Sequence, residues 1–186
     1  MTIRQIREIG DAHHKDMVEM GWSDPKKTDA HYKMLVIDEV CEAIQSHRKG
    51  NVRGNISEEV DSMMDKGEFC DQIFMNLFER YHKDTVTDEL ADAFLRLLSL
   101  AWMRGYGVVD DIYIPPISEK SMFTETAWGF VRMLVGAESD RVAVQKGILF
   151  IRKWCEVLKI DLYHACKRKM RYNQIRNDWK NGEKKY

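Results

Sequence analysis

Two pairs of carboxylates in this sequence have the spacing needed to bind a divalent cation. Glu39 and Glu42 are three residues apart, and Glu89 and Asp92 repeat that spacing. Residues three apart lie on one face of a helix, with Cβ atoms about 5–6 Å apart. If the two helices face each other, four carboxylates meet at one cavity and repel one another unless a cation neutralises them. Mg²⁺ suits such a site because it prefers oxygen ligands and commonly joins protein carboxylates to substrate phosphates.

The two pairs differ in their surroundings, although either pair alone is typical of a solvated helix surface. Helical geometry places the first pair opposite an apolar stripe formed by Ile37, Val40, Cys41 and Ile44, so this pair is expected to point outward. The second pair belongs to a helix that is apolar over most of its circumference, which predicts burial in a bundle. Its narrow polar strip consists of Glu89, Asp92, Arg96 and Ser99. Buried acids need partners, and a second acid pair with a metal ion would supply them.

A basic segment near the C-terminus has the chemistry to bind phosphate. Lys169, Asn173 and Arg176 follow a spacing of four and then three residues, so they line one face of a helix, which is expected to continue toward Lys180. Two cations beside an amide donor can bind phosphate oxygens, and arginine offers two parallel hydrogen bonds. The alternative is a solvated helix end whose cations complement the helix dipole.

These motifs together resemble the signature of the MazG-like nucleotide pyrophosphohydrolases. The similarity lies in Asp38, Glu39 and Glu42, in the Glu-Leu-Ala-Asp run of residues 89–92, and in the Lys-x-x-x-Asn-x-x-Arg segment of residues 169–176. That superfamily also includes the all-α dimeric dUTPases and the phosphoribosyl-ATP pyrophosphatases. The resemblance implies a helical bundle that forms a homodimer or homotetramer. It also implies Mg²⁺, or Mn²⁺ in its place, held by the four carboxylates, and cleavage of a nucleoside triphosphate to the monophosphate and pyrophosphate.

The sequence departs from that family in two ways. Residues 50–83 form an insertion between the two acidic segments that compact members lack, and such an insertion could reshape the base pocket. Asp38 stands where the family more often has glutamate, so we assign it a supporting role. The preferred base and sugar therefore stay open, and a dUTPase-like enzyme with a uracil-selective pocket is an alternative.

The periodicity of apolar residues predicts an all-α fold in a single domain covering residues 1–186. β-branched alternation is sparse, and glycine or proline falls where helices should end. The segment 23–25 is expected to open the first acidic helix, and residues 50–67 are expected to form a loop with about one helical turn. The predicted helices cover residues 3–20, 25–49, 70–81, 87–104, 124–136, 140–158 and 161–180, the last continuing into a basic tail that ends at residue 186.

The composition favours a folded protein without a nucleic-acid or membrane partner. Hydrophobic residues make up 44% of the chain, charged residues 32%, and the net charge is −1. The longest apolar runs, such as residues 147–151, are too short to cross a bilayer, and the first residues lack a secretory signal, so a cytoplasmic location is expected. Four cysteines without CxxC spacing are expected to be reduced core thiols.

Two further expectations concern residues outside the motifs and functions outside the family. His13 and His14 are neighbours that point in different directions on a helix, so they are expected to be surface or boundary residues.

A non-catalytic helical interaction module, in which the acids are surface charge, is one alternative function. An RNA-associated protein that uses the basic tail is another, although aromatic residues are too few there for a stacking platform.

Overall fold

The chain folds into a bundle of helices, as predicted from its apolar periodicity. The computed structural model describes residues 1–21, 23–54 and 56–176, and these form eight α-helices and no β-strand. The helices are α1 (Ile3–Glu19), α2 (Asp29–Arg48), α3 (Glu58–Lys66), α4 (Asp71–Tyr81), α5 (Val86–Arg104), α6 (Phe123–Val135), α7 (Asp140–Val157) and α8 (Leu162–Ile175). The all-α prediction is confirmed. Among the described residues, none of these helices has the length and hydrophobicity needed to span a bilayer.

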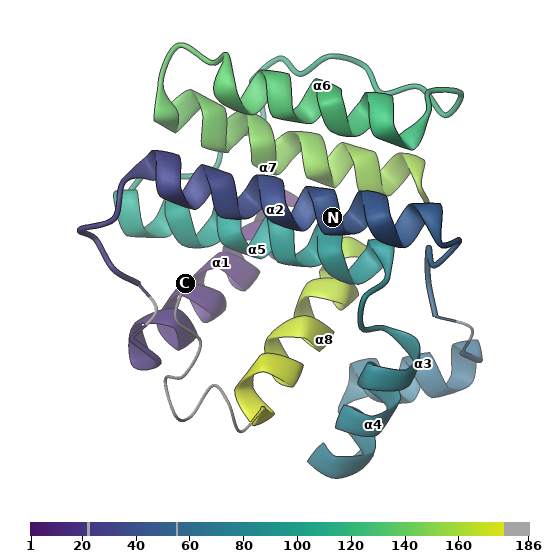
Figure 1. Ribbon diagram of the computed structural model, residues 1–186. Helices are drawn as coiled ribbons and strands as arrows, with labels where there is room; N and C mark the ends of the chain where they lie inside the picture. The colour runs from purple at the N-terminus through teal and green to yellow at the C-terminus, as the bar shows by residue number, and fades with distance from the viewer. Residues whose placement is uncertain (22, 55, 177–186) are drawn as a thin grey trace.

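Helix α5 is the centre of the bundle. Thirteen of its nineteen residues are buried, which agrees with its apolar circumference. Figure 1 shows α2 lying along α5, with α7 and α6 in the layers beyond and with α1 and α8 crossing below. Many of the buried apolar residues of the core belong to α5. Each buried leucine contributes about 1.5–3 kcal/mol through removal from water, so this helix is a main source of stability. The polar strip of α5, formed by Glu89, Asp92, Arg96 and Ser99, is therefore positioned by a tightly packed helix.

Helices α2 and α5 run antiparallel, and two ion pairs fix their register. Arg96 Nε lies 2.6 Å from Glu39 Oε1, and Arg104 Nε lies 2.7 Å from Asp29 Oδ1. The prediction that residues 23–25 open this helix was wrong. Thr28 is the N-cap and accepts a hydrogen bond from the His31 backbone N–H. The preceding residues form a turn instead, closed by the Lys27 N–H on the Asp24 carbonyl.

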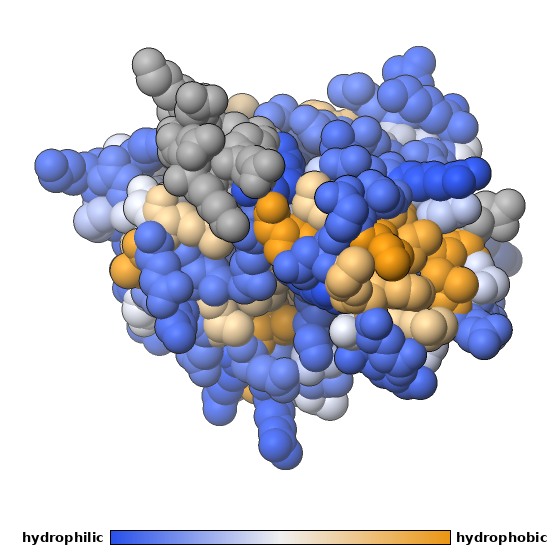
Figure 2. Space-filling view, turned by 90° about the horizontal axis from the view of Figure 1, so that it is seen from below, coloured by the Kyte–Doolittle hydropathy of each residue, from blue (hydrophilic) through white to orange (hydrophobic). Residues whose placement is uncertain are grey.

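The insertion between the acidic helices forms a helical hairpin, α3–α4, where a loop was expected at residues 50–67. Ser57 caps α3, and acidic residues in the first turn suit the positive end of its dipole. The hairpin shares a second, smaller apolar cluster with α8, formed by Met64, Phe74, Phe78 and Tyr172. In Figure 1 it extends below the main bundle, and the view from below in Figure 2 shows an area of hydrophobic residues. Ile73 of α4 is 48% exposed.

The predicted limits of the last three helices agree with the structure to within one residue, except at the C-terminal end of α8. Helices α6 and α7 begin and end within one residue of the predicted limits. Helix α8 ends at Ile175, because Arg176 has extended backbone angles (φ −64°, ψ 131°), and the predicted continuation to Lys180 lies outside the described residues. Of the four free cysteines, Cys155 and Cys166 are buried, whereas Cys41 and Cys70 are exposed, so the prediction of core thiols was right for only two.

Candidate active site

One cavity contains every residue that sequence analysis selected for catalysis, metal binding or phosphate binding. Its volume is about 260 Å³, and α1, α2, α5 and α8 contribute to its walls. The predicted residues that line it are Glu39 and Glu42 from α2, Glu89 and Asp92 from α5, Lys169 and Asn173 from α8, and Arg176 just after α8. Segments far apart in the sequence thus bring acids and cations to the same space.

Three of the four predicted metal ligands converge in this cavity. Glu39, Glu89 and Asp92 each offer a carboxylate oxygen, and these oxygens lie within 4.8 Å of one another. Glu42 also lines the cavity but is exposed and lies outside this group. The described residues thus provide a three-carboxylate cluster on two facing helices, which suits a hard cation with oxygen ligands.

The burial of Glu39 corrects the expectation that the first acid pair points outward. The face of α2 that packs on α5 contains Val36, Val40 and Ala43, and Glu39 lies among them with 6% of its surface exposed. Cys41, expected in the buried stripe, is exposed instead. A role as mere surface charge therefore does not fit Glu39.

Two acids of the cluster have strongly raised pKa values in spite of the cations beside the cluster. Burial raises the pKa of Glu89 to about 9, and the charges of Asp88 and Asp92 add to this effect. Burial also raises the pKa of Glu39 to about 7, together with the charge of Asp92 and against the opposing effect of Arg96. Acids with such pKa values are stabilised either by protons or by an added cation. The arrangement therefore favours cation binding.

Lys169 occupies the centre of this charge arrangement. Its Nζ atom lies 2.9 Å from Asp88 Oδ1 and 2.7 Å from Asp92 Oδ2. Burial alone would lower the lysine pKa, but these two carboxylates outweigh it and raise the pKa. The predicted phosphate-binding residue Lys169 thus forms ion pairs with Asp88 and Asp92, and a phosphate would compete with these carboxylates for its ammonium group.

Asp88 is a site residue that sequence reasoning missed. It is 5% exposed, and burial raises its pKa to about 6 although Lys169 opposes this. The signal was present in the sequence, because Asp88 precedes Asp92 by four residues and so lies on the same helical face. The Thr85 side chain caps α5 by accepting the Asp88 N–H, and this fixes the first turn.

His13 is a second residue that sequence reasoning placed wrongly. It lines the cavity and is 7% exposed, rather than lying at the surface. Burial lowers its pKa to about 4, so the imidazole is neutral at pH 7. Gly10 permits this position, because a Cβ there would lie 2.4 Å from the Trp102 ring. The close approach of α1 to α5 is fixed by the Trp102 indole N–H, which donates to Asp11 at 2.7 Å.

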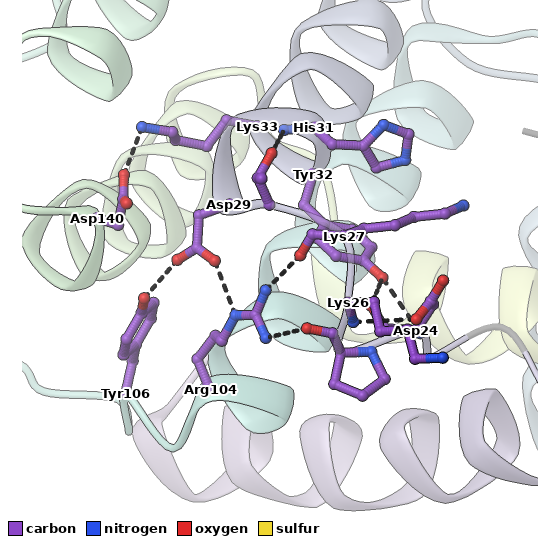
Figure 3. A network of polar contacts seen from close by, with 12 residues as sticks. Asp24, Lys26, Lys27, Asp29, His31, Tyr32, Lys33, Arg104, Tyr106 and Asp140 are labelled. Atoms are coloured by element: carbon purple, nitrogen blue, oxygen red, sulfur yellow. Dashed lines mark hydrogen bonds and ion pairs between the residues drawn. The ribbon is translucent and has the colours of Figure 1, made fainter.

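The opposite end of the α2–α5 pair is held by a group of contacts that we call the Arg104 network (Figure 3). The Arg104 guanidinium donates to Asp29 and to the carbonyls of Pro25 and Lys27, and the Tyr106 hydroxyl donates to the second Asp29 oxygen. These bonds fix the turn before α2. Because Lys27 and the first turn of α2 line the cavity, the network shapes that wall.

Comparison with known proteins adds no further identification. No family model, no curated protein and no solved structure matches this chain.

Proposed function

We propose that this protein hydrolyses nucleoside triphosphates to nucleoside monophosphates and pyrophosphate with the help of Mg²⁺. The observation that carries this proposal is the convergence of Glu39, Glu89 and Asp92 in one cavity with Lys169 and Arg176. A metal bound by carboxylates beside phosphate-binding cations is the usual arrangement for phosphoryl chemistry. The resemblance to MazG-like pyrophosphohydrolases supports the same reaction.

The acid cluster fits the metal that this reaction needs. Glu39, Glu89 and Asp92 would hold Mg²⁺, or Mn²⁺ in its place, with Glu42 nearby at the cavity wall. When bound, the ion supplies Lewis-acid charge at the phosphates and makes a bound water more acidic. The raised pKa values of Glu39 and Glu89 support this fit, because burial and neighbouring acids disfavour their ionised forms and a bound cation would stabilise those forms.

The surrounding residues would position the triphosphate and the attacking water. Lys169 and Arg176 would neutralise the negative charge of the leaving pyrophosphate, and the Asn173 amide would donate a hydrogen bond to a phosphate oxygen. Arg96 holds the Glu39 carboxylate in position at 2.6 Å, and Glu39 is the candidate for orienting the water and accepting its proton instead of binding the metal.

A substrate panel tests this proposal directly. The protein would be incubated with Mg²⁺ and each canonical nucleoside and deoxynucleoside triphosphate, and also with dUTP, and pyrophosphate would be measured separately from phosphate. We expect pyrophosphate release with at least one substrate, and a loss of more than roughly a hundredfold in Glu89→Gln. Glu59→Gln, which changes an exposed acid on α3, is the matched control and should keep full activity.

The outcome also separates the competing functions. Release of pyrophosphate from dUTP alone would favour the dUTPase-like alternative. If no substrate releases pyrophosphate and Mg²⁺ does not raise the melting temperature, the proposal is wrong and a helical interaction module becomes the better explanation. The resemblance further leads us to propose a homodimer or homotetramer in the cytoplasm, which light scattering and cell fractionation would examine.

A further inference from the structure

Besides Asp88 Oδ1, which lies against Lys169, two buried side-chain atoms of cavity-lining residues lack a hydrogen-bond partner among the described residues. They are the Ser99 hydroxyl oxygen and the His31 Nε2 atom, and both are buried. Ser99 as a residue is only 8% exposed. A buried hydroxyl without a partner costs about 1–3 kcal/mol, so such an atom in a cavity wall indicates a place where a ligand supplies the missing bond. Neither atom belongs to the acid cluster or to its cations.

Helical register places both atoms at a fixed distance from the acids. Ser99 follows Asp92 by seven residues on the polar strip of α5, which corresponds to about 10 Å along the helix. Since α2 runs antiparallel and Glu39 pairs with Arg96 while Asp29 pairs with Arg104, Leu35 lies alongside the turn of α5 that carries Ser99, and His31 lies one turn farther from the acids. The cavity therefore extends from the carboxylates to a second end, which we call the Ser99 end and define by Ser99, His31, Tyr32 and Leu35.

The Ser99 end has a fixed shape because the Arg104 network holds its wall. The Tyr32 hydroxyl donates to the Asp24 carbonyl at 2.9 Å, and the Tyr32 and His31 rings meet edge to face at 5.4 Å between centroids. In Figure 3, the His31 ring and the Lys33 side chain leave α2 in opposite directions, and Lys33 reaches Asp140. His31 is thus turned away from the neighbouring ion pair and toward the cavity that it lines.

The chemistry of this end differs from that of the acid end. Leu35 and Leu95 supply apolar surface, whereas Ser99 and His31 supply polar atoms that can form hydrogen bonds. A pocket with apolar walls and a few fixed polar atoms suits a flat heteroaromatic ring, whose faces pack on the side chains while its edge forms hydrogen bonds. The spacing from Asp92 corresponds to the length of a nucleoside whose phosphates lie at the acids.

We propose that Ser99 and His31 hydrogen-bond the edge of the nucleobase and thereby determine which nucleotides the cavity accepts. This inference rests on the proposed function in one respect, the placement of the phosphates at the acid end. It assigns specificity to residues outside the motifs that carry the family resemblance. Removing one of two edge hydrogen bonds should lower the affinity for the preferred base by about fivefold to tenfold, while a base that does not use it should bind equally well.

The test uses binding, so that it does not depend on hydrolysis. Calorimetric titration of the full chain with each nucleoside monophosphate, without metal, gives an affinity ratio between bases. We expect a preference for one base that Ser99→Ala reduces by about fivefold to tenfold and that His31→Phe, which keeps a ring but removes Nε2, also reduces. The control Ser62→Ala changes an exposed serine on α3 and should leave the ratio unchanged. A purely structural role of Ser99 would alter the melting temperature and leave the ratio intact.

Each outcome decides between this inference and the proposed function. If the ratio in Ser99→Ala and in His31→Phe stays within twofold of that of the unmodified protein, or if no monophosphate binds at millimolar concentration, the inference is wrong. Pyrophosphate release with no difference between bases would support the function and refute the inference. A base preference that depends on Ser99, without pyrophosphate release from any triphosphate, would do the reverse.

Discussion

Both ends of the α2–α5 pair contain acids beside cations, but the pKa values of these acids are shifted in opposite directions. In the Arg104 network, Asp29 accepts bonds from Arg104 and Tyr106, and each charged group has its partner. Although burial raises the pKa of Asp29, these bonds hold it below its usual value. In the acid cluster, burial and neighbouring acids raise the pKa of Glu89 to about 9 instead. The same two helices thus carry one balanced charge network and one unbalanced one.

This difference separates a structural network from a binding site. A network in which every charged group has a partner within the protein stabilises the fold without any bound ligand. Buried acids that lack enough cationic partners destabilise the folded protein until they bind protons or a cation. Such groups are found at binding sites, where the bound ligand offsets this destabilisation. The predictions below test whether the two ends differ in this way.

Removal of a central carboxylate should have the largest effect. Asp92→Asn takes one of the three converging oxygen ligands from the cluster, and we expect the affinity for Mn²⁺, used as a spectroscopic substitute for Mg²⁺, to fall by at least roughly a hundredfold. Glu42→Gln is the matched control, because Glu42 lines the cavity but is exposed. Its effect should stay below about tenfold in the same titration. Equal losses in both variants would mean that the three-acid cluster is not the metal site.

The pH dependence should have opposite signs at the two ends. Since the pKa values of Glu89 and Glu39 are raised from 4.5 to about 9 and about 7, the metal-free protein should lose stability as the pH rises from 4.5 toward 9. Metal binding must displace the Glu89 proton, so affinity should rise about tenfold per pH unit between pH 7 and 9. The lowered pKa of Asp29 contributes stability above pH 3.8 that is lost as the pH falls further.

Urea unfolding from below pH 3.8 up to pH 9 measures both effects. Glu89→Gln should flatten the decline at high pH, and Asp29→Asn should remove the contribution that is lost at low pH. A metal affinity independent of pH between 7 and 9 would contradict the assignment of Glu89 as a protonated ligand in the metal-free protein.

Disruption of the Arg104 network should destabilise the fold without touching metal binding. Arg104→Gln removes charge-assisted hydrogen bonds to Asp29 and to two carbonyls, and we expect the free energy of unfolding to fall by about 2 kcal/mol. Metal affinity should stay unchanged. Arg132→Gln, at an exposed position of α6, is the control and should change stability by less than about 0.5 kcal/mol. If folded Arg104→Gln protein bound the metal more weakly, the Arg104 network and the metal site would not be independent of each other.

Replacement of Lys169 should change the metal affinity only slightly, and the sign of that change is informative. The Lys169 ammonium lies between Asp88 and Asp92, so it competes with a metal ion for Asp92. We expect Lys169→Met to bind Mn²⁺ about threefold more tightly in the absence of nucleotide, whereas pyrophosphate binding should weaken. Lys169→Arg is the control that keeps the charge. Weaker metal binding in Lys169→Met would show instead that the lysine positions the carboxylates.

The fold was more predictable than the site because its signals are local. Apolar periodicity and glycines after helix ends located α4 to α7 within about two residues. Helix α3 was missed because its sequence is polar and glycine-flanked, and its apolar contacts come from residues distant in the chain, including those of α8. The burial of Glu39 could not be predicted from one helix, since it depends on which face of α2 packs on α5. The pairing of Lys169 with Asp88, and the entry of His13 into the cavity, likewise depend on helices that meet only in the tertiary structure.

Helix α8 joins the hairpin and the cavity through two adjacent residues. Arg168 binds Asp61 and Asp65 of α3 at 2.8 and 3.0 Å, while the next residue, Lys169, binds the acids of α5. Neighbouring residues of a helix turn and shift as one rigid body. We therefore expect binding to the hairpin that displaces α3 to move the Lys169 ammonium group in the cavity as well.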